Sequence, residues 1–340
     1  VRPSLPGDTM TSTLTELDRE ARMGAPGPLT TDREVRQISL ADFGARRAEI
    51  TAQLWAAATD IGFFQVVDHG ISPTEVDAAF AASQAFFALP AEVKAQYPLK
   101  KGLNSGYEFK SQVRPSVGTA DQKESFQLTR PHMAGLWPTD DEVEGFRETL
   151  LAFEAHCREV AMAVLSCFAD VLGLPRDFFA ARHDPANPQY QSTLRLIHYM
   201  AFPDELLDVP GTWRAGAHTD FDCLTLLFQR EGQAGLQVLP GTEAVAPSAD
   251  GYAWTPVPAT DEAITCNIGD MLMRWSDDRL PSNFHRVAAP ARGESTDPRY
   301  SIAFFAQADK DVVIEPPAGS HEPITAGEFL LQRIRANFRA

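Results

Sequence analysis

The hydrophobic pattern of the chain changes at about residue 193, and this change limits the folds that the chain can adopt. Before it, long stretches place apolar residues three and four positions apart, as amphipathic helices do. After it, short runs of β-branched and aromatic residues recur between clusters of Pro, Gly and Asp. Helices in one half and many short strands in the other predict an α+β fold, namely a double-stranded β-helix (jelly roll) core with a helical N-terminal region packed on it.

The two patterns also predict individual elements. The longest helix should end at Gly173, because a left-handed glycine commonly follows the last turn of a helix. In the first half we expect helices over 45–61, from Pro73 and over 141–172, and short strands near 38–40 and over 63–67 and 125–128. In the second half we expect strands over 194–199, 224–228, 236–239, 263–267, 284–287 and 300–306, and a closing helix over 329–338.

These elements divide the chain into four regions. Residues 1–34 lack apolar periodicity and carry Pro, Gly, Ser and Thr, so we expect a loose N-terminal leader there. Residues 35–185 should form a mostly helical N-terminal region, and residues 190–310 should form the jelly roll. Residues 311–340 should provide a C-terminal segment with its helix.

Charge and cysteine content narrow the class of protein. The net charge of −16 argues against nucleic acid and anionic membrane surfaces as partners, because like charges repel at long range. The most apolar stretch, 161–174, is too short to span a bilayer, and no secretory signal pattern opens the chain. The four cysteines form no Cys-x-x-Cys pair, so neither a zinc knuckle nor a thioredoxin-like site is indicated. We expect a cytoplasmic monomer or weak homodimer that acts on a small-molecule substrate.

One histidine stands in a pattern suited to metal binding. Of the eight histidines, only His218 is followed two positions later by a carboxylate, that of Asp220. Residues i and i+2 of a strand project from the same face, so both side chains can bind one metal ion. The alternative is a strand-end histidine that forms a hydrogen bond with a nearby carboxylate, and the motif taken alone favours this second interpretation.

The context of the motif changes this balance. His285 lies in a later β run, and a metal with two imidazole ligands and one carboxylate keeps open positions, as in non-haem Fe(II) oxygenases. Arg299 and Ser301 follow, opening the next expected strand on one shared face. A guanidinium and a hydroxyl in this arrangement can bind a carboxylate, although Asp297-Pro298 also fits a surface arginine beside a turn.

Blocks around these residues carry a family resemblance. Residues 216–229, 235–238, 267–287 and 299–305 resemble the isopenicillin N synthase-like family of 2-oxoglutarate/Fe(II)-dependent dioxygenases, and residues 60–72 resemble its N-terminal domain. The matches run in order from about residue 35 to 335. The C-terminal half is most similar to the thymine 7-hydroxylase-like members. The number and order of the matches make the resemblance more specific than any single motif.

The resemblance implies a role for each matching residue. It implies that His218, Asp220 and His285 bind Fe(II), and that Arg299 and Ser301 bind the distal carboxylate of 2-oxoglutarate. The cofactor set implied is Fe(II), with 2-oxoglutarate as co-substrate and dioxygen. The reaction implied is decarboxylation of 2-oxoglutarate to succinate and CO2, coupled to hydroxylation, desaturation or cyclisation of a small organic substrate.

Further positions follow from the same comparison. Tyr199 matches a tyrosine near the co-substrate, although Ile197 and Met200 depart from the plant pattern around it. Phe305 matches an aromatic residue that packs against substrate, with core filling as the alternative. Phe221 either lines the pocket or packs behind the metal strand.

Two alternative functions remain open, and four further residues have no expected role in catalysis. An oxidase of the same fold that does not use 2-oxoglutarate remains an alternative function, because it would use the same Arg-x-Ser pair. A non-catalytic binding protein of this fold is the other alternative. We expect His69 and His198 to be structural, and Lys123 and Glu124 to be fold or lid elements.

Overall fold

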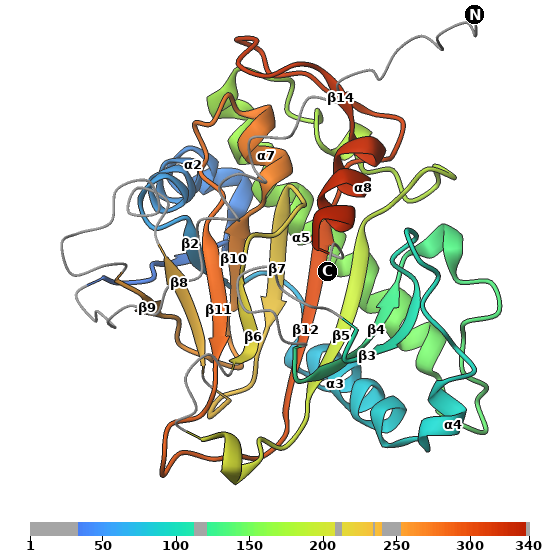
Figure 1. Ribbon diagram of the computed structural model, residues 1–340. Coiled ribbons are helices and arrows are strands. Elements are labelled where there is room, and N and C mark those ends of the chain that lie inside the picture. Colours follow the sequence, from blue (N-terminus) through green and yellow to red (C-terminus); the bar gives the residue numbers. More distant parts are fainter. Residues whose placement is uncertain (1–32, 112–120, 208–212, 234, 240–252, 338–340) are drawn as a thin grey trace, which may run out of the picture.

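The computed structural model describes residues 33–111, 121–207, 213–233, 235–239 and 253–337. Within these ranges two mainly antiparallel sheets form the centre of the protein (Figure 1). The expected leader lies outside the described residues except for its last two positions. Residues 112–120 and the end of the expected last helix at Phe338 also lie outside them.

The larger sheet has eight strands, and the smaller has four. In spatial order the larger contains β1 (Gln37–Ser39), β2 (Phe63–Val67), β10 (Ile264–Ile268), β7 (Leu224–Phe228), β12 (Arg299–Ala306), β5 (Thr193–Tyr199), β4 (Lys123–Leu128) and β3 (Gly106–Phe109). The smaller contains β6 (Trp213–His218), β11 (Phe284–Ala288), β8 (Leu236–Leu239) and β9 (Thr255–Pro256). Only β1 and β2 pair in parallel among these strands.

Side chains alternate between the two faces of the large sheet, as the pleat of a strand requires. On β12, Ile302, Phe304 and Ala306 belong to the main apolar core on the helical side. Arg299 and Phe305, which lie on the opposite face of the same strand, line a cavity on the side of the smaller sheet. One strand therefore supplies both the packing against the helices and a wall of the cavity.

Helices cover the outer face of the large sheet. These are α2 (Phe43–Asp60), α3 (Pro73–Ala88) and α5 (Phe146–Leu172), and α5 runs behind β7 and β12 in Figure 1. The apolar face of α5 is fully buried, with Leu150, Phe153 and Val164 at 0% exposure. Helix α5 ends at Gly173, which has φ of +72°, so the expected glycine terminus is confirmed.

The remaining elements are short. Helix α4 (Ala91–Lys94) follows α3, and α7 (Asp270–Trp275) follows β10. Strands β13 (Val313–Ile314) and β14 (Ile324–Thr325) form a two-stranded sheet just before the last helix, α8 (Ala326–Asn337). None of the helices in the described ranges is long and apolar enough to cross a membrane.

The expected jelly roll with a helical N-terminal region is confirmed, with local differences. Helix α5 begins at Phe146 rather than at residue 141. The elements that were not predicted are strands β3, β6, β9, β13 and β14 and helices α4 and α7. Gly145, with φ of +62°, separates α5 from the preceding turns. Strand β6 contains Ala215, Gly216 and Ala217, small residues with weak strand preference, so its extended form depends on pairing with β11.

Candidate active site

Three side chains that could hold a metal ion meet at one end of the smaller sheet. His218 is the last residue of β6, Asp220 follows it in the turn, and His285 pairs directly with His218 across β11 and β6. The Oδ1 atom of Asp220 lies 4.0 Å from Nε2 of His218 and 3.7 Å from Nε2 of His285. One ligand atom from each residue lies within 4.8 Å of the others, so the three can hold one metal ion.

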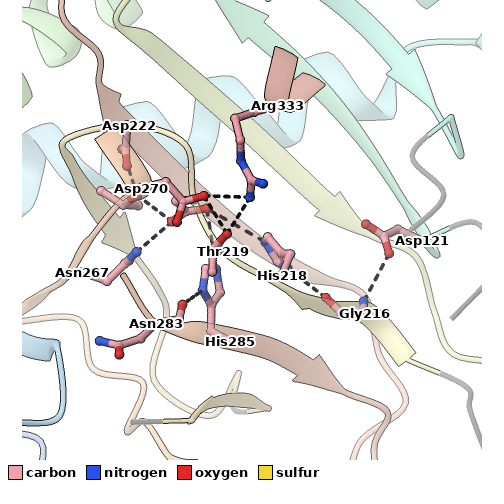
Figure 2. Close-up of polar contacts among 12 residues, drawn as sticks. Asp121, Gly216, His218, Thr219, Asp222, Asn267, Asp270, Asn283, His285 and Arg333 are labelled. Carbon is pink, nitrogen blue, oxygen red and sulfur yellow. Dashed lines mark hydrogen bonds and ion pairs between the residues drawn. The ribbon is translucent and has the colours of Figure 1, made fainter. Parts of the chain in front are cut away.

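Hydrogen bonds orient both imidazoles. Nδ1 of His218 donates to the carbonyl oxygen of Gly216 at 2.8 Å, and Nδ1 of His285 donates to that of Asn283 at 3.3 Å (Figure 2). Each Nε2 atom therefore presents its lone pair to the carboxylate of Asp220. A histidine that binds a metal ion through Nε2 carries its proton on Nδ1, and that Nδ1–H commonly donates to a backbone carbonyl. Both imidazoles have this arrangement.

The carboxylate of Asp220 is held from behind. Its Oδ2 atom accepts hydrogen bonds from Thr225 Oγ1 at 2.6 Å and from Asn267 Nδ2 at 2.8 Å, which leaves Oδ1 facing the imidazoles. Neither Thr225 nor Asn267 is singled out by the local sequence pattern. Burial and the nearby charge of Asp220 raise the pKa of Asp222 well above its ordinary value. A site with one carboxylate and two imidazoles fits Fe(II).

The triad opens into a cavity of about 850 Å³ between the sheets. Arg299, Ser301 and Tyr199 line it, and Arg299 is 2% exposed. Burial lowers the pKa of Arg299 from its ordinary value, with no carboxylate bonded to it among the described residues. Burial lowers the pKa of Arg214 as well, and the positive charge of Arg299 lowers it further. The buried guanidinium of Arg299 in the cavity wall suits an anionic ligand.

The hydroxyl of Ser301 gives an independent observation. It is buried, and no residue in the described part of the chain forms a hydrogen bond with its Oγ atom. An unpaired buried hydroxyl is costly, so such a group commonly has a partner that is supplied by a ligand or water. Ser301 lies two positions from Arg299 on the same strand face, and together they fit the carboxylate of 2-oxoglutarate.

Of the other residues considered in the sequence, the two phenylalanines line the cavity and the two histidines lie outside it. Phe305 and Phe221 both line the cavity, and the guanidinium carbon of Arg195 lies 5.0 Å from the centre of the Phe305 ring. His198 instead faces the helices, where its Nδ1 lies 2.7 Å from Glu124. His69 accepts a backbone hydrogen bond within its own turn, so both of these histidines have the expected structural contacts.

Two residues expected as fold or lid elements differ from each other. Lys123 lines the cavity and forms an ion pair with Asp121 at 3.1 Å. Glu124 points to the helical side, where it forms a buried ion pair with Lys94 at 2.7 Å. The alternation of strand β4 places these adjacent residues on opposite faces, so only Lys123 belongs to the site.

Comparison with known proteins decides the family. A sequence profile of the 2OG-Fe(II) oxygenase superfamily matches residues 190–308, and a profile of the N-terminal region of non-haem dioxygenases in morphine synthesis matches residues 35–146. Over 299 residues the chain is 34% identical to a proline hydroxylase of Petromyces alliaceus, covering 83% of this chain and 89% of that protein. The chain belongs to the 2-oxoglutarate/Fe(II) oxygenase family.

Further relatives of this oxygenase agree. A 2-oxoglutarate-Fe(II) type oxidoreductase of Emericella nidulans is 35% identical over 290 residues, covering 79% of this chain and 77% of that protein. Thymine 7-hydroxylase of Neurospora crassa, solved with α-ketoglutarate and thymine, has 28% identity and a TM-score of 0.77 over 92% of this chain and 99% of that one. The predicted dependence on Fe(II), 2-oxoglutarate and dioxygen is thereby confirmed at the level of the family.

Proposed function

We propose that His218, Asp220 and His285 bind Fe(II) in this oxygenase, and that Arg299 and Ser301 bind the distal carboxylate of 2-oxoglutarate. The observation that carries the proposal is that Nε2 of His218, Oδ1 of Asp220 and Nε2 of His285 converge at one end of the cavity. The wall of the same cavity contains the buried guanidinium of Arg299 and a hydroxyl, that of Ser301, with no partner among the described residues. When bound, Fe(II) supplies the oxidising chemistry, with 2-oxoglutarate and dioxygen as reactants.

The residues of the chain provide binding, orientation and exclusion of water. Arg299 gives one end of the co-substrate a fixed position, because its Nε is already bonded to the carbonyl oxygen of Gln233 at 2.9 Å. Thr225 and Asn267 keep one oxygen of Asp220 directed at the metal. Phe221 and Phe305 line the remaining space, where an apolar wall keeps water away from the reacting carbon.

Hydroxylation of a carbon atom in a small organic molecule is the reaction that we propose for the primary substrate. Relatives support a small molecule but differ in its identity, since one is named a proline hydroxylase and another was solved with thymine. The cavity is large enough for the co-substrate and a second molecule of similar or larger size. Measuring succinate released with nucleobases, amino acids and aromatic acids would identify the substrate by its stimulation of turnover.

The metal assignment has a direct test. His218→Ala should abolish decarboxylation of 2-oxoglutarate while the protein stays folded, because one of three ligands is lost. His321→Gln is a matched control, since His321 is paired with Asp278 outside the cavity and should keep wild-type turnover. Unchanged decarboxylation in His218→Ala would refute the metal assignment. Oxygen consumption by the wild type without succinate would instead support the oxidase that does not use 2-oxoglutarate.

A further inference from the structure

A fully buried arginine of the last helix reaches the back of the proposed metal site. Arg333 of α8 is 0% exposed, and its Nη2 atom lies 2.7 Å from Asp270 Oδ2 and 3.0 Å from Thr219 Oγ1. Its guanidinium carbon also lies 4.6 Å from the centre of the Phe221 ring. Figure 2 shows Arg333 directed at Thr219 and Asp270 from the side opposite Asn283.

These contacts are made to the residues that flank a proposed metal ligand. Thr219 precedes Asp220 and Phe221 follows it, so Arg333 touches both neighbours of that ligand. The hydroxyl of Thr219 accepts from Arg333 and donates to Asp270 Oδ2 at 2.9 Å. The backbone N–H of Asp270 in turn donates to the carbonyl oxygen of Asp220 at 2.8 Å. The backbone and both neighbours of Asp220 are therefore held by one group of contacts.

The same helix forms part of the cavity wall. Leu330, Leu331 and Ile334 of α8 line the cavity. Arg333 is buried behind the loop of residues 219–221, which carries Asp220. Helix α8 therefore contacts the space for the substrate and the loop that carries Asp220 at once. A shift of α8 would therefore change both the wall of the cavity and the contacts of this loop.

A purely structural role for the ion pair is the competing explanation. Removing an arginine from water is costly, and apolar side chains of similar volume often attach a helix equally well or better. Attachment of α8 therefore does not by itself require a guanidinium at this position. What a guanidinium adds is directed hydrogen bonding to two acceptors, Asp270 and Thr219, in a fixed geometry.

We propose that Arg333 is a positioning residue for the metal centre, which holds Thr219 and Asp270 so that Asp220 faces the two imidazoles only when α8 is docked. This inference rests on the metal assignment made under the proposed function. It adds that the C-terminal helix takes part in forming the metal site as well as in enclosing the cavity. The contacts act through the loop, and Arg333 itself touches neither metal nor substrate.

Thr219→Val tests the proposal with the least disturbance. The substitution keeps the shape of the side chain and leaves the Arg333–Asp270 ion pair in place, so the protein should fold. Co(II) is the probe, because its visible absorption reports both affinity and coordination geometry. We expect the dissociation constant for Co(II) to rise by about 10- to 100-fold, the range found when groups behind metal ligands are removed. We also expect the absorption band of the bound Co(II) to change shape.

Variants of the arginine provide a graded series. Arg333→Lys keeps the positive charge but cannot form the same directed pair of hydrogen bonds, so its Co(II) affinity should lie between those of the wild type and Arg333→Gln. Arg47→Gln is the matched control, because it breaks an ion pair with Asp170 that joins α2 to α5 away from the cavity. The control should lose stability and keep wild-type Co(II) affinity and spectrum.

The outcomes separate this inference from the proposed function. Wild-type Co(II) affinity in folded Thr219→Val and Arg333→Lys would overturn the role of Arg333 and leave the metal assignment intact. Absence of Co(II) binding by the wild type would overturn the metal assignment and this inference with it. If Arg333→Gln does not fold, the comparison of Thr219→Val with the wild type still decides the question.

Discussion

The guanidinium carbon of Arg299 lies 5.0 Å from the centre of the Tyr199 ring, and the two residues pair directly across strands β12 and β5. Lys123 pairs with Tyr199 on the other side, across β4 and β5. One row of the large sheet thus places a cation, an aromatic ring and a second cation side by side. All three line the cavity, so this row provides a part of the cavity wall that can bind an anion.

Arg299→Gln should raise the 2-oxoglutarate concentration needed for half-maximal turnover by about 10- to 100-fold. This corresponds to about 1.5–3 kcal/mol, the usual contribution of a hydrogen bond to a charged group. Arg158→Gln is a suitable control, since Arg158 is bonded to the carbonyl of His183 outside the cavity. Steady-state kinetics with varied 2-oxoglutarate would measure the effect, and an unaltered requirement would remove Arg299 from this role.

Ser301→Ala should leave the stability of the ligand-free protein unchanged or slightly higher. The hydroxyl has no hydrogen-bond partner among the described residues, so its removal takes away no contact within the protein. The rise in Tm caused by 2-oxoglutarate should become smaller, with binding weaker by about 5- to 10-fold from the loss of one hydrogen bond. Thermal unfolding with and without 2-oxoglutarate separates the two effects. A lower Tm without ligand would show that Ser301 is bonded within the protein.

Gly269→Ala should weaken both the fold and the metal site. A Cβ atom at residue 269 would lie 2.2 Å from the carbonyl oxygen and from Oδ1 of Asp222, so the turn after Asp220 must move. We expect a loss of about 1–3 kcal/mol in unfolding free energy, as for other overpacked sites, together with weaker Co(II) binding. Gly44→Ala has open space in helix α2 and should instead gain about 0.5–1 kcal/mol. Equal stability of the two variants in urea titrations would contradict this prediction.

The fully buried His183 should make the protein less stable as the pH falls from neutral. Burial lowers its pKa to about 4, while its Nδ1 donates to the carbonyl of Phe179 at 2.8 Å. The unfolded chain binds a proton near pH 6.5, but the folded protein does so only near pH 4, so stability that is present above pH 6.5 is lost as the pH falls between these values. At pH 5 the loss from this group should be about 2 kcal/mol.

A variant of His183 isolates this contribution. His183→Asn keeps a donor for the carbonyl of Phe179 and cannot titrate in this range. Urea unfolding at pH 7 and pH 5 should therefore show a larger loss for the wild type than for the variant. Equal losses in the two proteins would assign the acid sensitivity to other groups.

Local sequence patterns predicted most of the long helices and strands. The alternation in Arg299–Ala306 and the helical period in α5 predicted these elements because each needs only neighbouring residues to choose its buried face. The His218-x-Asp220 pair was found by its spacing, and its interpretation depended on the ordered blocks around it. Strand β6 was missed, because its small residues become extended through pairing with β11.

Contacts between distant segments required the tertiary structure. Asn267 and Thr225 hold the carboxylate of Asp220, and Arg333 lies 114 positions along the chain from Thr219, with no local pattern that connects them. The sequence by itself indicated the fold class and the family, and it singled out His218, Asp220 and His285 as candidate metal ligands. The side chains that surround Asp220 were decided by the packing of β7, β10, α7 and α8 around it. A hydrogen bond depends on the final distance between two atoms, whereas a residue pattern records only spacing along the chain.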